Sequence, residues 1–177
     1  ICDLAMLVEF VAEFETVERI RYTTSHPLEF SDALIEAYAR VPKLANYLHL
    51  PVQSGSNTVL DIMNRGYSVE HFIERIEKLR AVRPDISLST DIIVGHPGEG
   101  EAEFEATMDL IERIGFDAAF SFIYSSRPGT PAADMADDEP RALKKQRLKR
   151  VQDRIAVFNR QLMTDMVGTT QRVLVER

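Results

Sequence analysis

The sequence predicts an α/β protein built on a parallel sheet. Apolar runs with the length of buried strands occur at 47–52, 86–94 and 116–124, and the segments between them have the spacing of amphipathic helices. Strands that alternate with such helices form βαβ units with right-handed crossovers. With a fourth expected strand at 17–25, the chain has too few strands to close an eight-stranded barrel. The sheet is therefore either open or part of a larger barrel.

Cap and stop residues set the boundaries of the first elements. Helices are expected to begin at Ser31 or Asp32, at Ser56 or Asn57, and at Ser68, and Gly66 is suited to end one. In order, the expected elements are helix 4–14, strand 17–25, helix 32–40, strand 47–52, a short helix 57–64 and a longer helix 68–83.

The second half continues the alternation and then changes character. Gly115 is expected to end a helix that begins at Glu101. In order, the expected elements are strand 86–94, helix 101–114, strand 116–124, a loop at 129–138, a long helix 140–167 and a strand 170–176. An apolar side of the long helix is formed by Leu143, Leu148, Val151, Ile155, Phe158 and Leu162. We expect three units, at 1–139, 140–167 and 168–177.

Composition favours a soluble chain with one core. At 177 residues and 45% apolar content it can bury a sizeable core, and no stretch approaches the roughly 18–20 apolar residues that span a bilayer. The first residues lack an initiator Met and a basic region, so we expect no signal peptide and a chain cut from a longer protein. The single cysteine, Cys2, excludes a disulfide framework and a three-thiolate cluster on this chain. The expected compartment is the cytoplasm.

Charge is unevenly distributed along the chain. Residues 1–140 carry 11 basic and 25 acidic side chains, whereas residues 141–160 carry 8 basic and 1 acidic. A basic block on a long helix can contact the phosphates of a nucleic acid. The same block can instead lie against acidic neighbours of its own chain, and the sequence leaves both interpretations open.

Common catalytic motifs are absent. The chain has no Gly-x-x-x-x-Gly-Lys, Gly-x-Gly-x-x-Gly, Gly-x-Ser-x-Gly or His-Glu-x-x-His, which argues against kinase, hydrolase and metalloprotease classes. The four histidines have no metal-site spacing. A structural or surface role is the more common outcome for each, although His26, His49 and His96 lie at expected strand ends or turns.

Polar residues gather where the expected strands end. Gln53 follows strand 47–52, and Ser54 to Ser56 are expected to expose backbone N–H groups that accept a carboxylate or ribose hydroxyls. Arg65 offers a planar fork for a carboxylate or a ribose. Asp91 lies within an apolar strand, where an unpaired charge is costly, so it needs a donor or a polar pocket. A helix cap, a surface arginine and a structural hydrogen bond are the ordinary explanations.

Two turns follow the later strands. Residues 95–99 (GHPGE) contain two glycines and a proline, which let the backbone approach a ligand closely. Arg127 lies in a similar turn after the last strand and has the charge to face an anion. Several such turns at one edge of a parallel sheet are typical of a ligand site.

Five stretches, in order, resemble motifs of the methylthiotransferase branch of the radical S-adenosylmethionine (SAM) enzymes. They are RYTTSHP (21–27), HLPVQSGS (49–56), MNRGY (63–67), DIIVGHPGE (91–99) and YSSRPGTP (124–131). The resemblance implies a parallel-sheet fragment of a partial (β/α)6 TIM-like radical SAM barrel over 1–139. It also implies a helix that closes this domain and the truncated first strand of an RNA-binding TRAM domain at 168–177. The implied activity adds a methylthio group to isopentenyl-adenosine next to the tRNA anticodon.

The resemblance also implies two groups of site residues. Contacts to SAM are expected from Gln53, Ser54, Arg65, Asp91, Gly95, Pro97 and Gly98. By the resemblance, Ser25 and His26 are expected to face cofactor or substrate, and on the charges described above we add Arg127, Lys144 and Lys145 as expected substrate contacts. The family usually has Phe at the position of His96 and Thr at that of Gly100, which leaves the detailed shape of this turn open.

The cluster cysteines of such enzymes are missing from this chain. The family holds one [4Fe-4S] cluster on Cys-x-x-x-Cys-x-x-Cys and a second on an N-terminal domain, and neither motif occurs here. We therefore expect neither catalytic nor metal-ligating residues on this chain, and no activity from it alone. The implied partners are the tRNA anticodon stem-loop and a reductant protein such as a flavodoxin, with no membrane.

Three alternatives remain at this point. The substrate can be a ribosomal protein, since a related methylthiotransferase acts on one. The chain can be a non-catalytic RNA-binding segment built on the basic helix. It can also be a plain α/β scaffold whose turns only cap helices.

Overall fold

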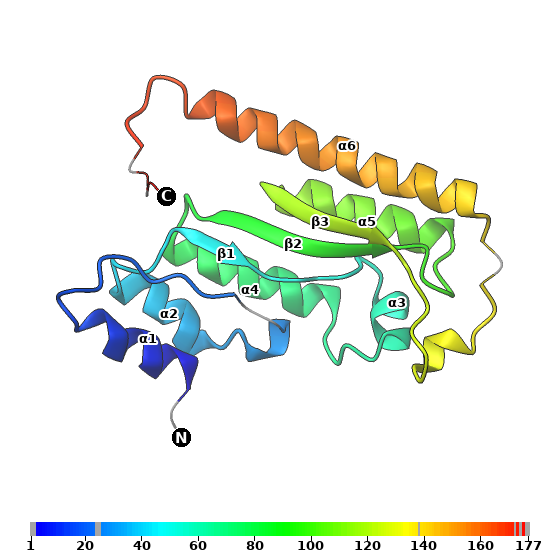
Figure 1. Cartoon of the computed structure of the whole chain (residues 1–177), viewed down its shortest axis with the longest axis horizontal. Coiled ribbons are helices and arrows are strands. Elements are labelled where there is room, and N and C mark those ends of the chain that lie inside the picture. Colours follow the sequence, from blue (N-terminus) through cyan, green and yellow to red (C-terminus); the bar gives the residue numbers. More distant parts are fainter. Residues whose placement is uncertain (1–2, 24–25, 138, 172, 174, 176–177) are drawn as a thin grey trace.

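A three-stranded parallel sheet lies at the centre of the structure, a computed structural model that describes residues 3–23, 26–137, 139–171, 173 and 175. The strands are β1 (Tyr47–His49), β2 (Ser87–Val94) and β3 (Ala118–Ile123), and their spatial order follows the chain (Figure 1). In the register, Leu48 lies opposite Leu88 and Asp91 lies opposite Phe120. The α/β fold with a parallel sheet is confirmed.

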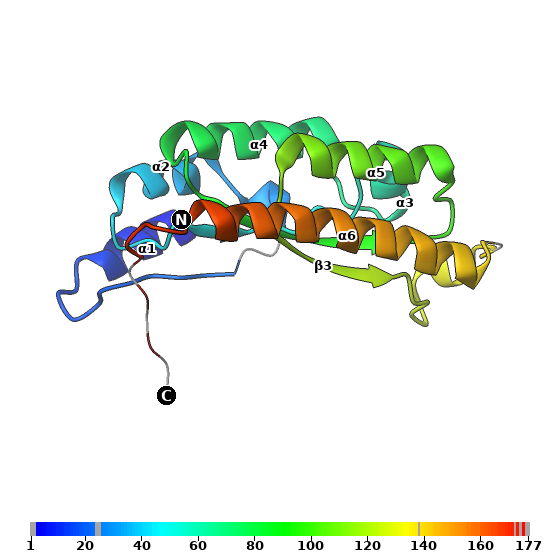
Figure 2. The same ribbon diagram turned by 90° about the horizontal axis from the view of Figure 1, so that it is seen from above.

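Helices cover one face of this sheet. Figure 2 shows α2 (Asp32–Arg40), α4 (Val69–Val82) and α5 (Glu101–Ile114) on the same side of the strands. The short α3 (Asn57–Ile62) follows the end of β1, and α1 (Leu4–Ala12) packs against α2. The long α6 (Arg141–Asp165) runs beside β3 and α5. Short 3₁₀ turns occur at Pro27–Glu29 and Pro131–Ala133.

Alternation along β2 separates a core face from an open face. Leu88, Thr90, Ile92 and Val94 are buried on the helix side, whereas Asp91 and Ile93, which alternate with them, are only partly buried. On β3, Phe120 and Phe122 are 59% and 55% exposed. Within the described part of the chain, no helix covers this second face of the sheet.

The expected fourth strand at 17–25 is wrong for its described part, residues 17–23. The segment forms one parallel bridge, between Ile20 and Leu44. Ile20 N donates to Lys43 O at 2.8 Å, and Ala45 N donates to Ile20 O at 2.8 Å. A strand needs a continuous ladder, but the neighbouring chain at residues 41–46 runs alongside for only one residue pair before β1 begins.

Of the two elements expected near the C-terminus, the helix forms and the strand does not form in its described residues. The long helix is confirmed, since α6 occupies 25 residues within the expected 140–167. The expected strand at 170–176 is wrong for residues 170, 171, 173 and 175, which are described and have no strand pairing. An isolated extended segment needs an edge to pair with, and α6 already lies along β3. The division into units at 1–139, 140–167 and 168–177 stays a prediction.

None of the helices formed by the described residues is both long and apolar enough to span a bilayer.

Candidate functional site on the open sheet face

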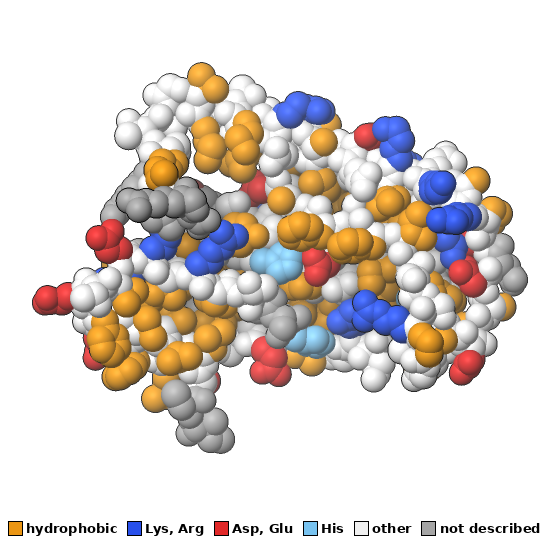
Figure 3. Space-filling model, viewed as in Figure 1, with side chains coloured by type: hydrophobic (Ala, Val, Ile, Leu, Met, Phe, Trp, Pro, Cys, Tyr) orange, Lys and Arg blue, Asp and Glu red, His pale blue; other side chains and the backbone are white. Residues whose placement is uncertain are grey.

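A line of polar side chains crosses the open face from β1 to β2. The Tyr47 hydroxyl lies 2.5 Å from Ser89 Oγ, and Ser89 Oγ lies 2.8 Å from His49 Nδ1. His49 Nε2 in turn lies 3.5 Å from Asp91 Oδ1. Figure 3 looks onto this face, where a histidine and an acidic side chain lie next to each other between hydrophobic side chains. The face therefore combines hydrogen-bonding groups with apolar walls, as small-molecule sites do.

Asp91 has the donor neighbour that its position in an apolar strand requires. Its side chain is 28% exposed and faces the His49 ring. That ring lies edge-on to Phe120 with centroids 5.9 Å apart, and Phe120 is the register partner of Asp91. The carboxylate is therefore held beside an imidazole and an aromatic ring.

Gln53 is hydrogen-bonded to Asp91 through the backbone. Its N–H donates to Asp91 O at 2.8 Å, and its carbonyl accepts from Ile93 N at 2.9 Å. Gln53 has a φ of 70°, a left-handed conformation that costs a non-glycine residue on the order of 1–2 kcal/mol. Gln53 lies beyond the end of β1, still pairs with Ile92 in a parallel bridge, and is 7% exposed.

Arg65 has a buried guanidinium nitrogen with no partner. Its Nε is inaccessible to solvent and makes no hydrogen bond, and no carboxylate of the described residues pairs with it. The residue lies between two left-handed positions, Asn64 with φ 53° and Gly66 with φ 72°. An unsatisfied buried donor of this kind is costly unless a ligand satisfies it.

Tyr67 places Arg65 near the end of β1. The Tyr67 hydroxyl donates to Val52 O at 3.0 Å, next to Gln53. Burial raises the pKa of Tyr67 to about 12, and the positive charge of Arg65 acts on this pKa in the opposite direction. His26 packs edge-on against the Tyr67 ring at 5.2 Å. The structure thus brings Gln53, Asp91, Arg65 and His26 to one end of the sheet.

The turn at Ser54–Ser56 does not present the free N–H groups that we expected. Ser54 N donates to Val52 O at 2.9 Å, Gly55 N to Thr107 Oγ1 at 2.9 Å, and Ser56 N to Ser54 Oγ at 3.2 Å. A β-carbon at Gly55 would come within 2.5 Å of Ala106 O. The expectation of free donors is wrong because this turn packs tightly against α5, and the Ser54 hydroxyl is buried on that side.

The turn at 95–99 is also tightly packed. Gly95 (φ 70°) donates its N–H to Glu99 Oε2 at 2.5 Å, and Pro97 is buried. At Gly98 the left-handed φ of 90° disfavours a side chain, and a β-carbon would come within 2.8 Å of Cδ1 at the end of the Ile62 side chain. His96 Nδ1–H donates to Pro97 O at 2.8 Å. Its ring lies 4.7 Å from the Tyr124 ring, and burial lowers the pKa of His96.

A buried ion pair that the sequence did not predict lies behind this turn. Glu99 is 1% exposed and Arg147 is 2% exposed, with Arg147 Nη1 3.6 Å from Glu99 Oε2. Burial raises the pKa of Glu99, while the Gly95 N–H and Arg147 act to lower it. Arg147 also lies 3.0 Å from Glu101 Oε2. A glutamate at the start of a helix and an arginine in a basic helix give no sequence signal of burial.

Most basic residues of α6 are neutralised within the chain. Lys144 pairs with Asp137, Arg150 contacts Glu105 at 2.7 Å and Arg154 pairs with Glu112. The interpretation in which the block lies against acidic neighbours is therefore confirmed for these residues and for Arg147. Lys144 is only 4% exposed, whereas Lys145 and Arg127 are exposed and have no ion-pair partner in the described ranges. Ser25 lies outside the described residues.

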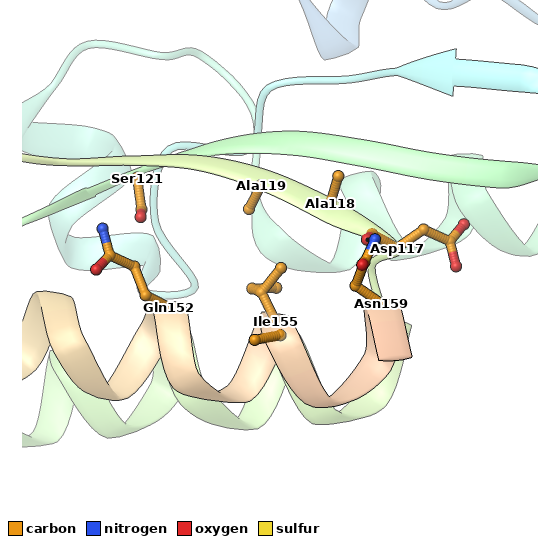
Figure 4. Close-up of a pocket in the computed structure, with 8 residues that line it drawn as sticks. Asp117, Ala118, Ala119, Ser121, Gln152, Ile155 and Asn159 are labelled. Carbon is orange, nitrogen blue, oxygen red and sulfur yellow. Dashed lines mark hydrogen bonds between the residues drawn. The ribbon is translucent and has the colours of Figure 1, made fainter. Parts of the chain in front are cut away.

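A separate hollow of about 280 Å³ lies between β3 and α6. In Figure 4 the side chains of Gln152 and Ile155 point from α6 toward Ser121 and Ala119 of β3, and that of Asn159 lies beside Asp117. Asn159 Nδ2 donates to Asp117 O at 3.0 Å and so joins the helix to the start of β3. None of the expected site residues lines this hollow.

Metal-ligating groups do not cluster in the part of the chain that the structure describes. The only cysteine, Cys2, lies outside the described residues.

Comparison with known proteins identifies similar chains. The Radical SAM superfamily model matches residues 3–111. A tRNA-2-methylthio-N(6)-dimethylallyladenosine synthase of Xanthomonas oryzae pv. oryzae is 59% identical over 98% of this chain and 36% of its own length. Relatives of the same name from Coxiella burnetii and Alkalilimnicola ehrlichii are 59% and 55% identical over 99% of this chain. The chain spans about 36–40% of the length of these relatives.

One solved structure is similar in fold. It is the coproporphyrinogen III oxidase HemN of Escherichia coli, described as a radical SAM enzyme, with a TM-score of 0.58 and 22% sequence identity. The match covers 76% of this chain and 31% of that chain. This likeness supports the expected partial barrel and concerns the fold alone.

Proposed function

The chain belongs to the radical SAM superfamily, and on that premise we propose that it forms part of a tRNA methylthiotransferase. The enzyme adds a methylthio group to isopentenyl-adenosine next to the anticodon. The relatives that share 55–59% of its residues carry the corresponding name and support the proposal. Because this chain spans 36–40% of those relatives, we assign the activity to a longer protein that contains it.

The polar groups at the end of the sheet fit SAM chemically. SAM carries a carboxylate, an ammonium group and ribose hydroxyls. Arg65 has an unsatisfied Nε for a carboxylate, whereas Asp91 accepts hydrogen bonds from ammonium or hydroxyl donors. The backbone of Gln53 is hydrogen-bonded to that of Asp91, and its side-chain amide has both a donor and an acceptor to offer a ligand. Gly95, Pro97 and Gly98 form the adjoining turn after β2 and, we propose, shape the adenine side.

This chain supplies binding and orientation for the reaction. SAM bound at a reduced iron–sulfur cluster supplies radical hydrogen abstraction. The chain has one cysteine, so the ligands of two [4Fe-4S] clusters belong to the rest of the protein. The open sheet face lets a base approach the SAM residues past Phe120 and Phe122, and His26 lies at the same end. We place the enzyme in the cytoplasm, with the anticodon stem-loop and a reductant such as a flavodoxin as partners.

One observation carries the proposal. The backbone of Gln53 is hydrogen-bonded to that of Asp91, and the unpaired Nε of Arg65 lies at the same end of the sheet. It is tested by substituting Arg65→Gln in the full-length protein and measuring SAM affinity by calorimetry. We expect a loss of about tenfold or more, since a charged hydrogen bond is worth about 1.5–3 kcal/mol. Arg113→Gln is the matched control, because Arg113 is exposed and pairs only with Glu77. Equal affinities of the two variants would refute the assignment of Arg65.

The substrate is tested separately from the cofactor site. Deletion of the gene should abolish methylthio-adenosine in tRNA, as measured by mass spectrometry of nucleoside digests. Re-expression of the full-length protein should restore it, and the Arg65→Gln variant should restore less. Unchanged tRNA together with a loss of methylthiolation on a ribosomal protein would instead identify the protein-modifying alternative.

A further inference from the structure

His49 has a polar neighbour at each ring nitrogen. Ser89 Oγ contacts Nδ1 at 2.8 Å, and Asp91 Oδ1 lies 3.5 Å from Nε2. The Tyr47 hydroxyl contacts the same Ser89 Oγ at 2.5 Å. The His49 side chain is only 13% exposed, so these contacts are largely shielded from water.

The contacts allow a hydrogen-bond arrangement that runs from Tyr47 through Ser89 to His49. Tyr47 O–H donates to Ser89 Oγ, and Ser89 O–H donates to His49 Nδ1. In this arrangement Nε2 carries the ring hydrogen, and Nε2 lies 3.5 Å from Asp91 Oδ1. The guanidinium of Arg21 lies 4.3 Å above the Tyr47 ring at the far end of this line.

The other oxygen of Asp91 is left for a ligand. No described residue forms a hydrogen bond or ion pair with Asp91 Oδ2, and 28% of the side chain is exposed on the open face. The backbone of Asp91 is fixed by Gln53 N, which donates to Asp91 O at 2.8 Å. Phe120 packs on the side of the His49 ring and limits its rotation. Both the backbone and one carboxylate oxygen are thus held before a ligand arrives.

We propose that His49 is a positioning residue that orients Asp91, so that Oδ2 accepts a hydrogen bond from a donor group of SAM. The donor is a ribose hydroxyl or the amino group, because a carboxylate oxygen accepts and does not donate. A preorganised acceptor binds more tightly than one that must be ordered on binding. This inference rests on the proposed function, and it adds a role that the motifs and the comparisons leave unassigned.

The test compares two substitutions of His49 in the full-length protein. His49→Gln keeps an N–H at the position of Nε2, whereas His49→Phe keeps a ring and removes both nitrogens. The probes are S-adenosylhomocysteine, its 2′,3′-dideoxyribose analogue and its desamino analogue, with affinities measured by calorimetry. We expect His49→Phe to lower the affinity for S-adenosylhomocysteine by about tenfold, and His49→Gln to lower it by about threefold or less. The loss of affinity in Ser89→Ala should lie between those of the two His49 variants, because the substitution leaves the imidazole ring in place.

The analogues separate positioning from a general structural role. If His49 acts through Asp91, one analogue will lack the donor group that binds Asp91. For that analogue His49→Phe should no longer weaken binding, and the analogue thereby identifies the donor. Equal losses for all three probes would overturn the inference. So would unchanged affinity in His49→Phe when Asp91→Ala weakens binding. If Asp91→Ala itself has no effect, the SAM site of the proposed function fails together with the inference. Thermal melting of each variant verifies that it is folded.

Discussion

The aliphatic stem of Lys144 lies directly on Gly95. A β-carbon at Gly95 would come within 2.5 Å of Lys144 Cδ and 2.6 Å of Cγ, while the Lys144 ammonium pairs with Asp137. This contact joins the first turns of α6 to the end of β2. It makes Lys144, which the sequence placed among the substrate contacts, part of the packing that shapes the 95–99 turn.

Replacing Gly95 with alanine should destabilise the chain substantially. The left-handed φ of 70° costs about 1–2 kcal/mol for alanine, and the contact with Lys144 adds about 1–3 kcal/mol of overpacking. Urea unfolding followed by circular dichroism measures the loss. Gly129→Ala is the matched control, because Gly129 has a φ of 82° and open space around it. Equal losses at the two glycines would contradict the steric part of this account.

Lys144 and Lys145 are adjacent in sequence but should behave oppositely. Lys145 is exposed without a described ion-pair partner, so Lys145→Gln should lower the salt dependence of tRNA binding by about one unit of slope with little change in stability. Lys144→Gln should lower stability and leave the slope unchanged, because its ammonium is already neutralised by Asp137. Binding titrations across a series of salt concentrations measure both slopes. The same slope for both variants would contradict the assignment of Lys145 to tRNA binding and of Lys144 to packing.

Local signals predicted the regular elements well. Gly115 ends α5 at Ile114 as expected, and the apolar run at 86–94 became β2. These elements are decided by hydrophobic spacing and caps, which are visible in a single sequence. Strand 17–25 failed because strand formation depends on a partner, and its neighbour at 41–46 allows only the Ile20–Leu44 bridge. Non-local pairing of this kind leaves no local trace.

The candidate site was predictable in part. Gln53, Arg65 and Asp91 were recognised through motifs and strand ends, and the structure brings them to one end of the sheet. The packing behind the site was not predictable. Ser54 is turned toward Thr107, and Glu99 is buried with Arg147, because elements distant in sequence close over them. His49 was noted only as a residue near a strand end, since its contacts come from Ser89 and Asp91 on another strand.

Glu99→Gln should change how stability depends on pH. Burial raises the pKa of Glu99 above its ordinary value of 4.5, so the stability it contributes is present below pH 4.5 and is lost as the pH rises through the folded-state pKa. Glutamine keeps an oxygen that accepts from Gly95 N and does not titrate. The free energy of unfolding of the variant relative to the native chain should therefore increase from pH 4 to pH 8. A constant difference across this range would show that Glu99 does not titrate as described.

His96→Phe should protect the chain against acid. Burial lowers the pKa of His96, and Lys144 acts in the same direction, whereas the bond to Pro97 O and the charge of Asp137 oppose it. A lowered histidine pKa contributes stability that is present above the ordinary value of 6.5 and is lost as the pH falls through the folded-state pKa. Phenylalanine keeps the edge-on contact with Tyr124 and removes the titrating group.

The measurement compares urea unfolding of the His96→Phe and native chains at pH 8 and pH 5. At pH 8 the variant should be slightly less stable, because it loses the hydrogen bond to Pro97 O, worth about 0.5–1.5 kcal/mol. At pH 5 the difference in unfolding free energy between the two chains should narrow or reverse. Only the native chain has an imidazole at this buried position, and its protonation opposes folding. His71→Phe serves as control, because it makes the same replacement on α4 and not on this turn. A pH-independent difference for His96→Phe would mean that the His96 pKa is not lowered in the folded chain.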